Sequence, residues 1–221
     1  DKKMDTWGTD ETGSFYLPQK LEYGTYYLRE VKAPEGYLLN TEDIQFKVIA
    51  ERDWENPLVV ACEDVPAMGK IHLKKTDKES EEALAGAVFN VIAAENITTQ
   101  DGTLQAAKAE VVTTLTTGSD GTATSTALHF GKYKLVETKA PNGYVTSEKN
   151  WDVTLSYADQ ETEIVTKDVS VTNTPNEVKI KKVAADSQEA LAGVEFQVWK
   201  KGTSAKDNLF DLYYADKPLF L

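Results

Sequence analysis

Three predicted β-strands each carry a polar residue on the face that is otherwise apolar. These residues are Lys75 in strand 70–76, Glu137 in strand 131–138 and Asn173 in strand 163–173. Side chains alternate between the two faces of a strand, so each of the three points toward the predicted core. An amine, a carboxyl and an amide are costly to bury unless they contact one another. A desolvated lysine also favours its neutral, nucleophilic amine, so this set is the first candidate for chemistry in the chain.

The segments that carry these side chains have the sequence pattern of β-strands separated by polar or glycine-containing turns. Apolar and polar residues alternate, and Thr, Val and Tyr are frequent, in seven runs: 70–76, 87–94, 109–116, 122–128, 131–138, 150–157 and 163–173. Only LQAAKAE at 104–110 suggests a short helix. The pattern predicts an all-β fold, an antiparallel seven-stranded β-sandwich.

Two unrelated motifs recur with the same offset of 107 residues. LREVKAPEGY at 28–37 returns as LVETKAPNGY at 135–144, and the LAG motif that contains Leu84 returns around Leu191. A shared offset indicates a tandem repeat about one domain long. We therefore expect a C-terminal part of one unit at 1–68, a complete domain at 69–176 and an N-terminal part of a further unit at 177–221.

The repeat assigns equivalents to the three polar residues in the partial units. Glu30 is equivalent to Glu137, and Asp64 takes the position of Asn173. Lys182 is equivalent to Lys75. The lysine of the first unit would precede Asp1, and the glutamate and asparagine of the last unit would follow Leu221.

The complete unit resembles the Cna B-type, or SpaA-type (prealbumin-like), repeat domains of Gram-positive surface adhesins and pilins. The resemblance rests on four landmarks in order along the unit: Lys75-Thr76-Asp77, LAGAVF at 84–89, GKYKLVETKAPNGY at 131–144 and VTNTP at 171–175. It implies a spontaneous intramolecular isopeptide bond in which Lys75 is the nucleophile, Asn173 the carbonyl donor and Glu137 the catalytic proton shuttle. By the same resemblance, Lys182 and Asp64 are possible cross-linking residues, with Glu30 as their shuttle. The reaction turns over once, so the protein is not an enzyme.

The resemblance further implies a structural stalk or shaft module of an extracellular, cell-wall-attached protein, with the anchor and signal outside this segment. The implied partners are neighbouring repeat domains of the same or identical chains. The alternative is an adhesin domain that binds a host extracellular-matrix protein through exposed tryptophans; Trp7, Trp54, Trp151 and Trp199 are the candidates, and their scatter favours packing.

A further hypothesis concerns the two partial units. The 177–221 part of one molecule could complement the 1–68 part of another and bring Lys182 to Glu30 and Asp64, which would make the chain a self-assembling fibre subunit. The competing interpretation is that the chain was cut from a longer array at an arbitrary point, or that a linker was omitted.

Composition excludes several other classes. A formal net charge of −12 disfavours nucleic-acid binding, and no apolar run is long enough to insert into a membrane. Two isolated histidines and one cysteine make neither a metal site nor a disulfide, so we expect no metal and no cofactor. Cys62 shares the parity of Val60 and is predicted to be a small buried residue.

Overall fold

The computed structural model describes residues 6–18, 20–50, 55–198 and 213–214. The chain divides into two compact units, residues 1–175 and residues 176–221. Every regular element in the described ranges is a β-strand, which confirms the predicted all-β class. No helix long and apolar enough to span a membrane occurs in those ranges.

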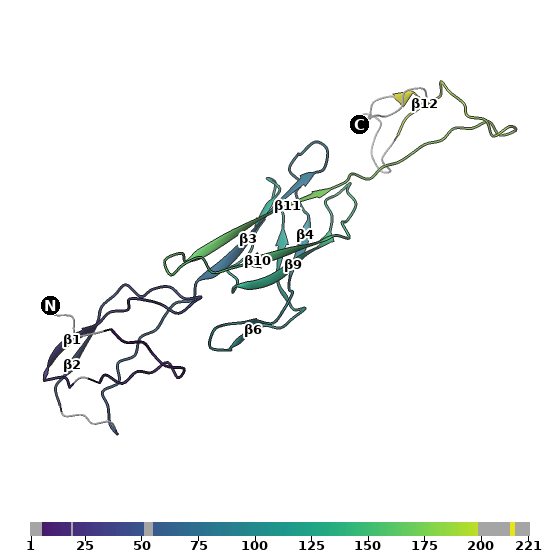
Figure 1. The fold of residues 1–221 in the computed structure, drawn as a ribbon. Helices are drawn as coiled ribbons and strands as arrows, with labels where there is room; N and C mark the ends of the chain where they lie inside the picture. Colours follow the sequence, from purple (N-terminus) through teal and green to yellow (C-terminus); the bar gives the residue numbers. More distant parts are fainter. Residues whose placement is uncertain (1–5, 19, 51–54, 199–212, 215–221) are drawn as a thin grey trace. The chain divides into compact units, whose positions relative to one another are not determined.

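The middle part of the first unit consists of two main sheets (Figure 1). The four-stranded sheet has the order β10-β9-β4-β7, and the three-stranded sheet has the order β11-β3-β8. Their bounds are β3 Met68–Asp77, β4 Val88–Ala93, β7 Val111–Thr116, β8 Thr122–Thr124, β9 Gly131–Lys139, β10 Asn150–Leu155 and β11 Ile164–Asn173. Each strand overlaps a run that the alternating sequence pattern predicts.

The two outermost strands of this domain in sequence, β3 and β11, pair in parallel (Figure 1). The register runs from Ile164 opposite Met68 to Asn173 opposite Asp77. The other pairs in these two sheets are antiparallel, as predicted. A parallel pair needs a long connection, and here the intervening strands of the domain supply it.

The segment predicted as a short helix is a strand and a turn instead. β6 (Leu104–Ala106) pairs with β5 (Ile97–Thr98), and residues 107–109 turn the chain toward β7. Ala106 is buried opposite the fully buried Ile97. Tertiary burial of this edge outweighs the helix propensity of an alanine-rich run, so the prediction of a helix at 104–110 is wrong.

The core lies between the two sheets and follows the period-two pattern. Ile71 and Leu73 of β3 face Phe89 and Val91 of β4, and all four side chains are fully buried. Trp151 packs edge-on against Phe89, with 5.9 Å between ring centroids. This apolar layer surrounds the positions of the three polar residues singled out above.

In the described part of residues 6–67, β1 (Gly24–Leu28) pairs with β2 (Ile44–Val48). Tyr26 stacks on Phe46 across this pair. Hydrogen bonds connect the segment to the middle domain: the Leu39 N–H donates to the Gln160 carbonyl (2.8 Å) and the Tyr157 hydroxyl to the Tyr37 carbonyl (3.0 Å).

Cys62 is exposed, so the prediction that it is buried is wrong. Its strand parity is that of the half-buried Val60, but residues 58–65 are not part of a sheet. Alternation determines which side of a segment a residue occupies, whereas burial requires a second layer on that side.

The second unit contains β12 (Glu195–Phe196), which pairs with β13 (Tyr213–Tyr214). Its backbone repeats a contact of the middle domain at the offset of 107. The Leu191 N–H donates to the Lys182 carbonyl (3.1 Å), as the Leu84 N–H does to the Lys75 carbonyl (3.0 Å). The local fold around Lys182 therefore resembles that around Lys75.

Candidate functional site

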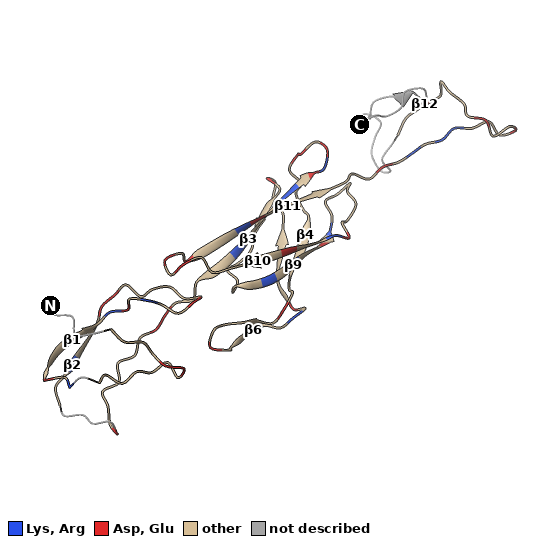
Figure 2. Ribbon diagram, in the orientation of Figure 1, with Lys and Arg blue, Asp and Glu red and all other residues tan. Residues whose placement is uncertain are grey.

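Charged residues are scattered along the strands and loops (Figure 2). Three of those in the described ranges are buried. They are Lys75, Asp77 and Glu137. Asn173, only 3% exposed, is buried with them. Burial of so many polar groups in one place is unusual and marks this as the candidate site.

Lys75 lies in β3 with its whole side chain inaccessible to solvent. Its backbone N–H donates to the Gly121 carbonyl (2.7 Å). Gly121 has a φ of +73°, and a Cβ there would lie 2.5 Å from the Lys75 carbonyl oxygen. The turn before β8 therefore requires glycine in order to hold the lysine strand in place.

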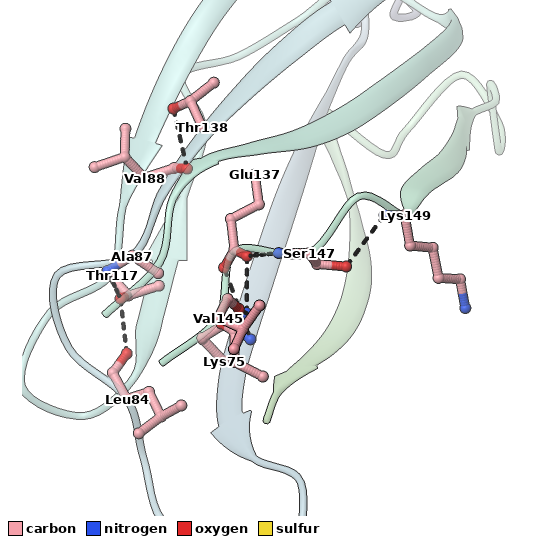
Figure 3. Close-up of polar contacts among 11 residues, drawn as sticks. Lys75, Leu84, Ala87, Val88, Thr117, Glu137, Thr138, Val145, Ser147 and Lys149 are labelled. Carbon is pink, nitrogen blue, oxygen red and sulfur yellow. Dashed lines mark hydrogen bonds and ion pairs between the residues drawn. The ribbon is translucent and has the colours of Figure 1, made fainter. Parts of the chain in front are cut away.

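Glu137 lies in β9 and occupies the centre of the site (Figure 3). Its Oε2 accepts hydrogen bonds from the Ser147 backbone N–H (2.6 Å) and from Asn173 Nδ2 (2.8 Å). Its Oε1 lies 3.9 Å from Lys75 Nζ. That distance is an ionic contact but too long for a hydrogen bond. One carboxyl thus faces both the amine and the amide.

Asn173 lies near the end of β11, beside the end of β3. Its Nδ2 donates to Glu137 Oε2 and to the Val145 backbone carbonyl (2.6 Å). Its Oδ1 has no hydrogen-bond partner within the described ranges. The amide nitrogen is thereby held by two acceptors while the carbonyl is left open.

Burial dominates the electrostatics of Lys75. It lowers the pKa of the lysine to about 8, against the opposing effect of the Glu137 and Asp77 carboxylates. Lys75 Nζ, Glu137 Oε1 and Asn173 Oδ1 are all buried, and none of them has a hydrogen-bond partner among the residues that the structure describes. Each such atom costs about 1–3 kcal/mol. The arrangement keeps an amine, a carboxyl oxygen and an amide carbonyl close together at a cost in stability, and these groups are suited to amide exchange.

The sequence motif Lys75-Thr76-Asp77 contains Asp77 but indicates no role for it. Its carboxylate accepts hydrogen bonds from the backbone N–H groups of Glu79 (2.7 Å) and Ser80 (2.9 Å) and interacts with the Tyr144 hydroxyl. The backbone hydrogen bonds are the main cause of its lowered pKa. Parity with Lys75 was the signal that could have found it, because residues two apart on a strand share a face.

The partial units contain three residues equivalent to those of the site: Glu30, Asp64 and Lys182. The structure places the first two of them close together. Glu30 and Asp64 interact, and Glu30 Oε2 accepts a hydrogen bond from the Asn40 N–H (2.7 Å), as Glu137 does from Ser147. Burial, followed by the neighbouring Asp64, raises the pKa of Glu30 against the effect of the Asn40 hydrogen bond. Lys182 is exposed and belongs to the second unit.

Two sheets packed over one apolar core, with no helix in the described ranges, define a β-sandwich module. Comparison with known families gives the more specific assignment. The chain belongs to the SpaA family of prealbumin-like fold domains, whose model matches residues 1–57 and 69–170. This confirms the resemblance on which the site prediction was based.

The chain is also similar to individual known proteins. The chain is 28% identical over 122 residues to the trypsin-resistant surface T6 protein of Streptococcus pyogenes serotype M6; the match covers 55% of this chain and 20% of that protein. Its fold is similar to that of the Bacillus anthracis TIE protein, with a TM-score of 0.58, 23% identity, and coverage of 88% of this chain and 32% of the other. The group B streptococcus pilus 2b backbone protein matches at 25% identity and a TM-score of 0.39, over 67% and 53% of the two chains. The chain thus spans about a fifth of the curated relative and a third of the TIE protein.

Proposed function

We propose that this chain is a structural stalk or shaft segment of an extracellular, cell-wall-attached surface protein, an adhesin or pilin, and that an isopeptide bond between Lys75 and Asn173 cross-links its middle domain. Membership of the SpaA family and the relative that is named as a surface protein support the first part. The observation that carries the second is the 2.8 Å hydrogen bond from Asn173 Nδ2 to Glu137 Oε2, in a site where Lys75 is fully buried.

The proposed reaction exchanges one amide for another. A proton passes from the Lys75 ammonium to the Glu137 carboxylate, and the neutral Nζ attacks Cγ of Asn173. The Cγ–Nδ2 bond then breaks as Glu137 returns a proton to Nδ2, and the second proton lost by Nζ also leaves with that nitrogen. The products are a Lys75–Asn173 amide and one ammonium ion, so the protein loses the mass of one ammonia together with the proton that the Lys75 ammonium carried. Burial supplies the neutral amine, and folding supplies proximity worth roughly 7–11 kcal/mol of barrier.

The bond would connect the first and last strands of the domain. β3 and β11 are neighbours and parallel, so a pull on the two ends of the domain loads their pairing directly. A covalent amide between them would prevent the strands from separating. It would also constrain the unfolded chain as a disulfide does, in a sequence with a single cysteine.

Intact mass of the purified, denatured protein tests the proposal. We expect a deficit of one ammonia, and we expect Lys75→Ala, Glu137→Ala and Asn173→Ala to restore the full mass. Lys74→Ala is the matched control, because Lys74 is the exposed neighbour on the same strand. A folded wild-type protein with the full unmodified mass would contradict the proposed bond.

A second candidate function is covalent assembly between copies through Lys182. The observations that favour it are the contact between Glu30 and Asp64 and the exposure of Lys182. A denaturing gel should then show a ladder that Lys182→Ala abolishes while the ammonia deficit of the middle domain persists. A single monomeric band, with Lys182 free by peptide mapping, would exclude this function.

The two tryptophans that the structure describes support a role in binding host matrix less than they support a role in packing. Trp151 packs on Phe89, and Trp7 stacks on Phe15 at 5.9 Å between ring centroids. Trp54 and Trp199 lie outside the described residues. The stalk function therefore remains the proposal that the geometry supports best.

A further inference from the structure

The segment Tyr144–Ser147, which follows β9, contacts both partners of Lys75 through its backbone. The Val145 carbonyl accepts a hydrogen bond from Asn173 Nδ2 (2.6 Å). The Ser147 N–H donates to Glu137 Oε2 (2.6 Å) (Figure 3). The orientation of the Asn173 amide and the position of the Glu137 carboxyl therefore both depend on where this segment lies.

The Val145 carbonyl can distinguish the two ends of the amide. A carbonyl oxygen only accepts hydrogen bonds, so it attracts Nδ2 and repels Oδ1. With Glu137 Oε2 as the second acceptor, it keeps the nitrogen beside the carboxyl that must protonate it. A flipped amide would place Oδ1 there instead, and the leaving nitrogen would lose its proton donor.

Contacts from two strands hold the segment in place. The Val145 N–H donates to the Thr174 carbonyl (3.1 Å), and Tyr144 forms an isolated β-bridge with Pro175, just after β11. On the other side, the half-buried Tyr144 interacts through its hydroxyl with the Asp77 carboxylate. Asp77 lies two residues after Lys75 on β3 and is 4% exposed.

A simpler role for Asp77 would be to shape the turn after β3, whose N–H groups its carboxylate accepts. The second unit indicates that shaping this turn is not the whole role of Asp77. At the offset of 107, Ala184 replaces Asp77, yet its N–H still donates to the Glu189 carbonyl (2.9 Å), as the Asp77 N–H does to Glu82 (2.8 Å). The turn thus forms without the carboxylate. In the middle domain the carboxylate adds its hydrogen bonds to the Glu79 and Ser80 N–H groups and, beyond the turn itself, the contact with Tyr144.

We propose that Asp77 and Tyr144 form a latch that positions the Val145 carbonyl against Asn173 Nδ2 and so selects the productive orientation of the reacting amide. Both are positioning residues, since neither side chain touches the reacting atoms. The inference rests on the proposed isopeptide bond and assigns the residues that prepare its acceptor.

The test measures the rate of bond formation as a function of pH. Protein recovered unfolded and uncross-linked from inclusion bodies is refolded by dilution, and ammonia loss is followed by intact mass. Refolding is monitored separately by tryptophan fluorescence. Tyr144→Phe is compared with Tyr157→Phe, which removes a tyrosine hydrogen bond to a backbone carbonyl elsewhere in the same unit.

We expect Tyr144→Phe to slow ammonia loss about three- to tenfold at every pH, without moving the midpoint of the pH profile, which reports on Lys75. Tyr157→Phe should react at the wild-type rate. A change in stability alone would alter the fluorescence transition and leave the rate of the folded protein unchanged.

Asp77→Ala provides a second, independent variant, because Ala184 shows that the turn tolerates alanine. It should lower the plateau rate as Tyr144→Phe does. It should also move the midpoint to lower pH, because Glu137 and Asp77 are the charged groups that face Lys75 and one of them is removed.

The outcomes separate the latch from the bond. If wild-type protein folds without losing ammonia, the proposed function fails. If wild-type protein reacts and both Tyr144→Phe and Asp77→Ala keep its plateau rate, the latch is wrong and the bond stands. If Tyr144→Phe does not fold, the plateau rate of Asp77→Ala decides.

Discussion

Lys75 and Asn173 lie on the same buried face of two neighbouring parallel strands, and Asn173 is two residues beyond Val171, the direct partner of Lys75. The pairing of β3 and β11 therefore brings the amine and the amide into one apolar compartment, where Glu137 faces both.

The first prediction concerns the stability that the cross-link adds. The proposed bond closes a loop of about 100 residues, which in the chain-entropy model is worth about 4–5 kcal/mol. Wild-type protein should therefore unfold at a clearly higher guanidinium concentration than Asn173→Ala. Lys75→Ala, which also prevents the bond, should unfold close to Asn173→Ala. Equal midpoints for all three proteins would show that no cross-link contributes to stability.

The second prediction is a pH dependence confined to protein without the bond. In Asn173→Ala the amine of Lys75 stays titratable, with a pKa of about 8 in the folded state against 10.5 in the unfolded state. The unfolded state then binds more protons between these values, so the free energy of unfolding should rise with pH above about 8, by up to about 3 kcal/mol near 10.5. Below pH 8 the lysine is charged in both the folded and the unfolded state, so the free energy of unfolding does not change with pH through this group.

Urea unfolding between pH 7 and 10 measures this effect before buried Tyr133, whose ordinary pKa is 10.0, begins to contribute. Lys75→Met in the Asn173→Ala background is the control and should lack the rise. Cross-linked wild-type protein should lack it too, because an amide nitrogen does not titrate in this range. If the free energy of unfolding still rises with pH in the Lys75→Met control, groups other than Lys75 cause the rise.

The third prediction tests the close approach of Gly121 to the lysine strand. Gly121→Ala should destabilise the protein much more than Gly102→Ala. Both glycines have positive φ, so both variants bear the strain of about 1–2 kcal/mol. Only at Gly121 does the new Cβ also meet the Lys75 carbonyl and the Leu84 nitrogen, at 2.5 and 3.0 Å. Similar urea midpoints for the two variants would show that β3 can shift to accommodate the methyl group.

The fourth prediction concerns Cys62, which the structure places at the surface. A maleimide should label the native protein at this single thiol. Partial desolvation of the sulfur, followed by the charges of Asp64 and Glu30, raises the pKa of Cys62, so labelling at neutral pH should be slower than in the unfolded protein. Glu30→Gln should speed it modestly. A native protein that resists labelling altogether would favour the buried position that strand parity predicts.

The sequence alone determined the class of fold and the membership of the candidate site. Alternation placed the strands of the middle domain within a few residues. It also put Lys75, Glu137 and Asn173 on core-facing positions, because the period of a strand is a local property of the backbone. Cys62 shows the limit of the same argument: parity defines a side of the segment, and only a packed second layer makes that side an interior.

Only the tertiary structure decided how the site is arranged. The parallel pairing of β3 with β11 joins residues almost 100 positions apart, and no local pattern encodes which strand becomes a neighbour. The orientation of the Asn173 amide depends on the Val145 carbonyl and that of Glu137 on the Ser147 N–H. These are backbone groups, which every non-proline residue carries. The type of a residue therefore does not indicate that its backbone belongs to the site, and only the folded structure shows it.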